Sequence, residues 1–352
     1  MPEASAFEAR YERVRRWVHT YPLPPRGFEP LSATNAQLAE YGLPERPDAP
    51  RESARFRLWE EMLKPPTDFV MPDFTSVEPR QLVFARHGSD PKRRASILAR
   101  GAAGHLGDSR NWSGACITPV RPNRFFHVAG AWRVPEPAIP DVAPDDADPV
   151  DPEYRSSTWI GIGGHRPYNT LPQIGTSQHV SLVNGTRKTD LGAWWQWWVR
   201  DRPEHHVPYP IPITVKVGDR ILAELTVEAP APGDVHFRIK NQRTGEFATF
   251  KVIAPANIVP LGATAEWIHE RPTKFDSRDM YPMPKCSDVE FEYCLAKSTP
   301  VFGGPETVQG LINPRLIRMY EDFGGPHRSA FVSLPKRLGA SSLRISYREA
   351  GA

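Results

Sequence analysis

Cysteine is scarce in this sequence, and its scarcity argues against two ways of stabilising a small domain. The chain holds three cysteines among 352 residues, Cys116, Cys286 and Cys294, with no CxxC or paired Cys/His spacing. A disulfide scaffold needs a dense, even set of cysteines, and a structural zinc site needs closely spaced Cys or His ligands. The odd count leaves at least one thiol free, and Cys286 and Cys294 could pair only in an oxidising compartment. We therefore expect neither a disulfide scaffold nor a metal site.

Long apolar runs and an excess of one charge are also missing. No window approaches the eighteen consecutive apolar residues that a membrane-spanning helix needs. The net charge of +3, from 44 basic and 41 acidic residues, gives no electropositive footprint for nucleic acid. Phosphate-binding Gly-rich loops, Gly-x-Ser-x-Gly and His-Glu-x-x-His are absent. We therefore expect no membrane or nucleic-acid partner and no cofactor.

The first ten residues do not have the composition of a secretion signal. They lack the basic region and the apolar segment that such a signal requires. We therefore expect a cytoplasmic location. The sequence does not indicate an oligomeric state.

Proline, in contrast, is abundant, and it shapes the first third of the chain. The 39 prolines are about twice the usual share, and they interrupt long helices. Short helices are expected at residues 4–18, 34–42 and 52–64, separated by proline-rich segments. We interpret residues 1–105 as a partly helical extension, either an arm that wraps the main domain or a pro-segment. Its basic cluster at residues 92–94 is interpreted as solvated surface.

Residues 106–350 have the pattern of an all-β domain. Turn signals such as Gly-Asp and Thr-Gly separate many short apolar segments without intervening helices, which indicates a sandwich or barrel. Residues 135–156 are rich in Pro and Asp and are expected to form a long solvated loop. Strands are expected at residues 124–134, 157–162, 178–183, 193–199, 213–217, 221–227, 235–240, 248–253, 263–270, 287–294, 328–333 and 342–347.

Two segments place a carboxylate and a carboxamide among apolar residues. In the segment Ala265–Glu270, strand alternation places Glu266, Ile268 and Glu270 on one face. Gln173 lies upstream in a second apolar segment. A carboxylate can take a proton from water as a general base, and an amide NH2 can donate to the oxyanion of an attacked carbonyl. Such a pair can hydrolyse a carbonyl compound without a metal, a thiol or a serine.

From Asn111 to Tyr347 the chain resembles the glutamic peptidases, or eqolisins. Six segments in the family's order carry the resemblance: Asn-Trp-Ser-Gly-Ala (111–115), Gly-Ala-Trp-Arg-Val-Pro (130–135), Trp-Ile-Gly-Ile-Gly-Gly (159–164), Leu-Pro-Gln-Ile-Gly (171–175), Ala-Trp-Trp-Gln-Trp-Trp (193–198) and Ala-Glu-Trp-Ile-His-Glu (265–270). Residues 28–44 are also similar to the leader of bacterial-type members. Any one of these motifs alone is a weak signal, but the ordered set is specific.

The resemblance implies a fold, an activity and a set of site residues. The fold would be an antiparallel β-sandwich of two curved sheets, lectin-like or glucanase-like, and the activity a pepstatin-insensitive endopeptidase acting on polypeptides. Glu270 would be the catalytic base and later acid, and Gln173 would position water and stabilise the oxyanion. Glu266 is interpreted as a structural neighbour. The residues expected to contact the substrate are Trp159, Gly163, Trp194, Gln196 and Trp198, while Trp195 and Trp197 would point to the opposite face.

Two departures from the family pattern affect the expected chemistry. Gly163 stands where the family has Asp, and Gln196 stands where it has Glu. With fewer acids near Glu270, we expect less repulsion between carboxylates and therefore an acidic lower limb of the pH–rate profile. We also expect activity to persist further toward neutrality. A non-catalytic lectin-like or peptide-binding sandwich remains an alternative, and so does a zymogen whose extension fills the cleft. His205 and His206 are interpreted as a surface loop, because no ligand partner lies at a helpful spacing.

Overall fold

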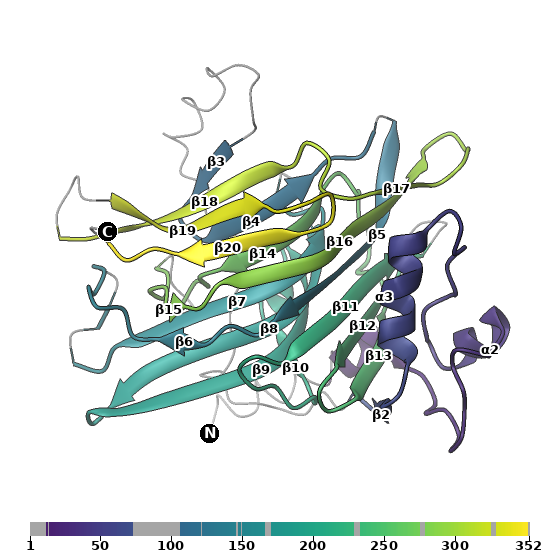
Figure 1. Ribbon diagram of the computed structural model, residues 1–352, viewed down its shortest axis with the longest axis horizontal. Coiled ribbons are helices and arrows are strands. Elements are labelled where there is room, and N and C mark those ends of the chain that lie inside the picture. The colour runs from purple at the N-terminus through teal and green to yellow at the C-terminus, as the bar shows by residue number, and fades with distance from the viewer. Residues whose placement is uncertain are drawn as a thin grey trace.

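The computed structural model describes residues 12, 14–72, 106–120, 122–145, 147–148, 150–165, 170–228, 233–274, 279–324 and 329–350. Figure 1 shows a molecule built almost entirely of strands, with its α-helices at one side. Most of the strands form one continuous array, in which each strand is hydrogen-bonded to the next.

This continuous array folds into two facing layers. The front layer consists of β10 (Tyr209–Ile211), β9 (Thr186–Val199), β8 (Thr170–Val183), β7 (Glu153–Ile162), β14 (Ala265–Glu270) and β4 (Trp112–Ile117). The back layer consists of β16 (Val289–Pro300), β5 (Asn123–Arg133), β11 (Arg220–Val227), β12 (Val235–Asn241) and β13 (Glu246–Val252). The layers are joined through β18 (Arg315–Asp322), β19 (Ser329–Arg337) and β20 (Leu343–Tyr347). The remaining short strands are β3 (Leu106–Ser109), β6 (Pro137–Ala138), β15 (Lys285–Cys286) and β17 (Thr307–Gln309).

Aromatic side chains fill the space between the two layers. The ring centroid of Trp195 on β9 lies 5.4 Å from those of Phe237 and Phe250 on the back layer. The indole of Trp132 on β5 crosses to the front layer and donates to Thr176 Oγ1 at 3.0 Å. The indole of Trp267 crosses the other way to the carbonyl of Ala129 at 2.9 Å. These contacts confirm the expected sandwich, because buried indoles bridge the layers with their N–H groups satisfied.

Residues 14–72, which we call the arm, pack on the outer face of the back layer. The arm contains β1 (Val18–Thr20), α2 (Asn35–Glu40), α3 (Ser53–Leu63) and β2 (Asp68–Val70). Figure 1 shows α2 and α3 at the side of the molecule where the back layer lies. The apolar cluster between the arm and the layer is formed by Leu38, Leu43, Leu58, Trp59, Met62 and Leu63 against Ala129, Ala131, Leu222 and Phe247. Both β1 and β2 pair with β13, so the arm also covers an edge of the back layer.

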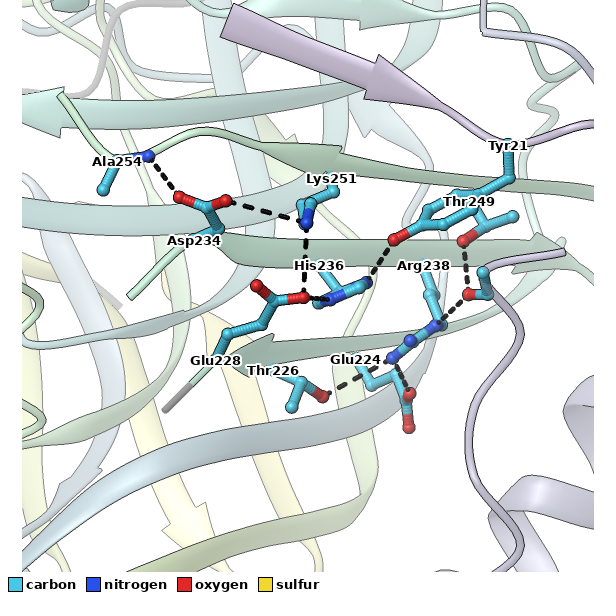
Figure 2. Close-up of polar contacts among 11 residues, drawn as sticks. Tyr21, Glu224, Thr226, Glu228, Asp234, His236, Arg238, Thr249, Lys251 and Ala254 are labelled. Carbon is cyan, nitrogen blue, oxygen red and sulfur yellow. Dashed lines mark hydrogen bonds and ion pairs between the residues drawn. The ribbon is translucent and has the colours of Figure 1, made fainter. Parts of the chain in front are cut away.

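Polar contacts fix the arm to the back layer as well (Figure 2). The Tyr21 hydroxyl lies 3.0 Å from His236 Nδ1 on β12. The carbonyl oxygen of Gly42 accepts from Arg238 Nε and from Thr249 Oγ1, each at 2.7 Å. Because these donors are largely buried, losing the carbonyl acceptor would leave them without a partner, which is costly. The arm is therefore bound by specific contacts and not only by apolar burial.

The expected elements match the structure where local signals are strong. The helix expected at residues 34–42 is α2, with Thr34 and Gln37 forming a capping box, and the helix expected at residues 52–64 is α3. Of the helix expected at residues 4–18, only part is described, and Val18 already belongs to β1. The basic cluster at residues 92–94 lies outside the described residues.

The strand expected at residues 213–217 is wrong. These residues are not in a strand, because side chains satisfy the backbone there. Glu246 accepts from the Thr214 amide, Asp219 accepts from the Lys216 amide, and Asn241 donates to the Thr214 carbonyl. The long loop expected at residues 135–156 is shorter than predicted, since β7 begins at Glu153. Within the described residues, no helix is long and apolar enough to cross a membrane.

Candidate active site

Strand alternation on β14 separates two kinds of side chain, as the sequence predicts. Trp267 points between the layers, and His269 contacts Thr158 Oγ1 through Nδ1 at 3.0 Å. Glu266, Ile268 and Glu270 point to the outer face of the front layer, where Ile268 packs against a cluster of aromatic and aliphatic side chains. All six residues of β14 are buried. Two carboxylates therefore lie in a largely apolar environment on one face.

Glu270 is held by donors from two neighbouring strands or their ends. Asn111 Nδ2 donates to Oε1 at 3.1 Å, and the Trp159 indole donates to Oε2 at 2.8 Å. The β4–β14 register places Trp112 opposite Glu270. The rings of Trp112 and Trp159 form a T-shaped contact, with centroids 5.0 Å apart and planes at 77°. Asn111 is itself fixed, because Ser109 donates to its Oδ1 at 3.0 Å. Both carboxylate oxygens are thus oriented by side chains from the matched motifs.

Burial dominates the electrostatics of both carboxyl groups. Burial raises the pKa of Glu270 to about 8, although hydrogen bonds from Trp159, Trp112 and Asn111 favour the ionised form. Burial also raises the pKa of Glu266 to about 7, although hydrogen bonds from Thr264 and from the backbone amides of residues 163–165 favour the ionised form. No carboxylate contributes to the shift of Glu270 among these causes. Desolvation, which the argument from nearby acids leaves out, therefore opposes the acidic lower limb expected from the sequence.

Gln173 lies on the same face of the front layer as the two carboxylates. The registers place Glu266 opposite Gly161, Gly161 opposite Gln173, and Gln173 opposite Gln196. Directly paired residues share a face, so this row crosses four strands. Glu266 is level with Gln173, and Glu270 lies four residues further along β14. Gln173 and Glu270 are both 0 % exposed, so a peptide reaches them only if neighbouring chain moves aside.

The amide of Gln173 has one defined partner. Its Nε2 donates to Gln196 Oε1 at 2.7 Å, and Gln196 Nε2 donates in turn to the carbonyl of His205 at 3.1 Å. Within the described residues, Gln173 Oε1 has no hydrogen-bond partner. An amide carries two N–H donors and an acceptor oxygen. Gln173 therefore keeps one N–H and its oxygen for a water molecule or a substrate.

The aromatic residues expected to contact substrate have defined positions. Trp194 and Trp198 belong to the outer-face cluster of Trp159 and Ile268, while Trp195 and Trp197 lie between the layers. Trp194 is 4 % exposed and Trp159 is 0 % exposed. Trp159 has a second contact that the sequence did not indicate, its bond to Glu270.

Gly163, expected to contact the substrate, begins the loop that follows β7 and binds Glu266. Gly163 has φ of +96°, a backbone conformation that disfavours a side chain. Its amide donates to the Thr264 carbonyl at 2.9 Å. The amides of Gly164 and His165 then donate to Glu266 Oε1 at 3.1 and 3.2 Å. Glu266 thus binds the loop backbone, and the family's Asp would be strained at this glycine.

His205 is not the surface residue that the sequence predicts. It ends the short helix η2 (Pro203–His205), is 5 % exposed, and stacks on Trp17 of the arm with ring centroids 4.4 Å apart. His206 stacks on Trp198 at 5.5 Å. Sequence reasoning missed the role of His205 because its contact to Gln196 uses a main-chain oxygen, which any residue carries. The role of Asn111 as a donor to Glu270 was also missed, although Asn111 opens the matched segment at residues 111–115.

Metal-ion and disulfide sites are both absent among the described residues. No group of three or more His, Cys, Asp or Glu side chains in the described part of the chain is placed to hold a metal ion. All three cysteines are described, and none forms a disulfide. What the arrangement provides is an oriented carboxylate and an oriented carboxamide on one buried face.

Comparison with known proteins identifies the matching family. A model described as the peptidase A4 family matches residues 110–309, a range that includes Gln173, Glu266 and Glu270. No curated protein matches the chain.

Several solved structures are similar to this chain. Scytalido-glutamic peptidase with a transition state analog inhibitor has 19% sequence identity and a TM-score of 0.49, covering 68% of this chain and 98% of its own. SCP-B, a member of the eqolisin family in a complex with the tripeptide Ala-Ile-His, has 18% identity and a TM-score of 0.46, with the same coverage. Aspergilloglutamic peptidase from Aspergillus niger has 20% identity and a TM-score of 0.42, covering 55% of this chain and 99% of its own.

Proposed function

The chain belongs to the peptidase A4 family and is a peptidase of the glutamic type, and from that premise we propose that Glu270 and Gln173 form its catalytic dyad. The observation that carries the proposal is the environment of Glu270. It is a fully buried carboxylate whose two oxygens accept from Asn111 and Trp159. Gln173, on the same face, keeps an amide N–H and an acceptor oxygen for reacting groups.

In the proposed reaction, Glu270 acts first as a base. Its carboxylate takes a proton from water while the water oxygen forms a bond to the scissile carbonyl carbon. The carbonyl oxygen becomes an oxyanion, and the remaining N–H of Gln173 stabilises it by donating a hydrogen bond. Gln173 Oε1 accepts from the attacking water and orients it.

Glu270 then acts as an acid. The protonated carboxyl group gives its proton to the amine nitrogen as the carbon–nitrogen bond breaks and the carbonyl re-forms. A pKa of about 8 suits this exchange, because a group that titrates near the working pH can both accept and release a proton. The bonds from Asn111 and Trp159 keep the carboxylate oriented through both steps.

Glu266 is the competing choice of base, because the register sets it level with Gln173. Its Oε1 already accepts from the amides of Gly164 and His165. A carboxylate that binds backbone amides is needed in its ionised form to hold the loop, and protonating it in each turnover would weaken those bonds. We therefore assign the base to Glu270 and a loop-binding role to Glu266.

The assignment is tested with an unfolded polypeptide substrate and three matched variants. Gln173→Ala and Glu270→Gln should each lower kcat at least about 10²-fold, the typical loss for an oxyanion donor or a general base. Glu266→Gln changes the same chemical group on the same strand and face, and should retain more activity than Glu270→Gln. Full activity of the Glu270→Gln protein would refute the dyad.

A further inference from the structure

The arm reaches the neighbourhood of the proposed dyad through one aromatic contact. Trp17 stacks on the ring of His205, with centroids 4.4 Å apart and planes 8° from parallel. Burial lowers the pKa of His205 to about 4, so the ring is neutral near pH 7. A neutral, nearly parallel stack holds the turn at residues 203–205 by contact area and not by charge.

Trp17 itself is held at a fixed place on the sandwich. Its carbonyl accepts from the Ile253 amide at 2.7 Å, just beyond the end of β13. The next residues form β1, in register with β13 from Val18 opposite Val252. Tyr21 then contacts His236 (Figure 2), and Val14 is buried in the core between the layers. The position of the Trp17 ring is thus set by contacts on both sides of it in the sequence.

The turn that Trp17 supports carries the acceptor for Gln196. The carbonyl of His205 accepts from Gln196 Nε2 at 3.1 Å, and Gln196 Oε1 accepts from Gln173 Nε2 at 2.7 Å. Gln173, Gln196 and the His205 carbonyl therefore form a chain in which each amide has one orientation. Rotating the Gln173 amide by half a turn would place its oxygen against Gln196 Oε1, and two acceptors repel each other.

This chain explains why an amide suits position 196. A carboxylate there could accept from Gln173, but its second oxygen would face the His205 carbonyl, which is also an acceptor. The neutral amide instead accepts on one side and donates on the other. All three groups are buried, Gln173 and Gln196 at 0 % exposure and His205 at 5 %. In such an environment a polar group without a partner is costly, so the orientation is strongly preferred.

We infer that the arm is a positioning element of the active site: Trp17 fixes the turn at His205, the His205 carbonyl fixes Gln196, and Gln196 fixes the amide of Gln173. The inference rests on the proposed dyad, because it gives the arm a role only if Gln173 takes part in catalysis. It also reverses the idea of the arm as an inhibitor. Both helices of the arm pack on the outer face of the back layer, away from the face that carries Gln173 and Glu270.

The test measures kcat and KM for variants of the full chain on a fluorogenic peptide, at a temperature where each is folded by circular dichroism. Trp17→Leu removes the stack but keeps an apolar side chain, and His205→Leu removes the partner ring but keeps the carbonyl. Each should lower kcat about tenfold or more with KM little changed, since small misplacement of a catalytic group has effects of that size. Trp17→Phe keeps an aromatic ring and should restore most of the lost kcat.

Trp59→Leu is the matched control, because Trp59 is also an arm tryptophan but packs on the back layer and donates to the Pro44 carbonyl at 2.9 Å. It should lower stability and leave kcat of the folded protein unchanged. The Trp17→Leu/His205→Leu double variant should lose no more kcat than either single variant, because both remove the same contact. Equal kcat for Trp17→Leu and Trp59→Leu would overturn the inference.

Gln173→Ala, measured in the same assay, separates the two claims. If it is inactive while Trp17→Leu keeps full kcat, the positioning role of the arm is wrong and the dyad stands. If Gln173→Ala itself keeps full kcat, the dyad is wrong and the inference fails with it. A loss of kcat in Trp17→Leu that Trp17→Phe restores, with Gln173→Ala inactive, supports both.

Discussion

Replacing Glu270 by Gln should stabilise the protein at pH 8 while destroying its activity. Burial raises the pKa of Glu270 from its ordinary value of 4.5 to about 8. The folded state therefore binds this proton more tightly than the unfolded state. The contribution of Glu270 to the free energy of unfolding is complete below pH 4.5 and is lost as the pH rises toward 8. At 1.36 kcal/mol per pH unit, the loss is on the order of 5 kcal/mol.

A Gln side chain carries no such penalty, and its oxygen can still accept from Trp159. The assay is urea unfolding of both proteins at pH 5 and pH 8. Comparing the two proteins at each pH cancels the other titrating groups, including buried histidines such as His127, whose lowered pKa acts in the opposite direction. The advantage of the Glu270→Gln protein should grow by a few kcal/mol between pH 5 and pH 8. An advantage that stays constant or shrinks would refute the reasoning.

Three further predictions concern single contacts. Trp159→Phe removes the 2.8 Å hydrogen bond to Glu270. Because a hydrogen bond to a charged group is worth about 1.5–3 kcal/mol, the lower limb of the kcat/KM profile should move to higher pH by about 1–2 units, and an unmoved limb would contradict the assignment. Deleting residues 1–72 should expose Leu222 and Phe247 and raise binding of a hydrophobic dye, whereas higher activity without aggregation would show the arm to be inhibitory. Gly163→Asp places a side chain at φ +96° and should cost about 1–2 kcal/mol of stability, measured by urea unfolding; no loss would show that the backbone relaxes there.

Local signals in the sequence predict those parts of the fold that local interactions determine. The capping box of Thr34 and Gln37 fixes the start of α2 within a few residues. Strict alternation on β14 separates Trp267 from Glu266 and Glu270. In contrast, the wrong strand at residues 213–217 has suitable apolar residues, but the side chains of Glu246 and Asn241, about thirty residues away in the sequence, satisfy the backbone of Thr214. No local pattern reports such partners.

The electrostatics of the site could not be read from the sequence for the same reason. The matched motifs indicate Glu270 and Gln173, but they do not say how deeply either is buried. Burial comes from residues far apart in the chain, such as Trp112 and Trp159 around Glu270. It raises the pKa of Glu270, which a count of nearby acids alone does not predict. The main-chain acceptor at His205 also leaves no trace in the sequence, because every residue carries a carbonyl.

The most direct test of the dyad is a side-by-side cleavage assay of the wild-type, Glu270→Gln and Glu266→Gln proteins between pH 5 and pH 9. Both variants lose one buried carboxyl group from the same face of β14, so differences in folding and net charge are matched. The account predicts that Glu270→Gln loses cleavage at least about 10²-fold at every pH, while Glu266→Gln keeps measurable activity. Loss of activity in Glu266→Gln together with wild-type cleavage by Glu270→Gln would contradict the account and move the base to Glu266.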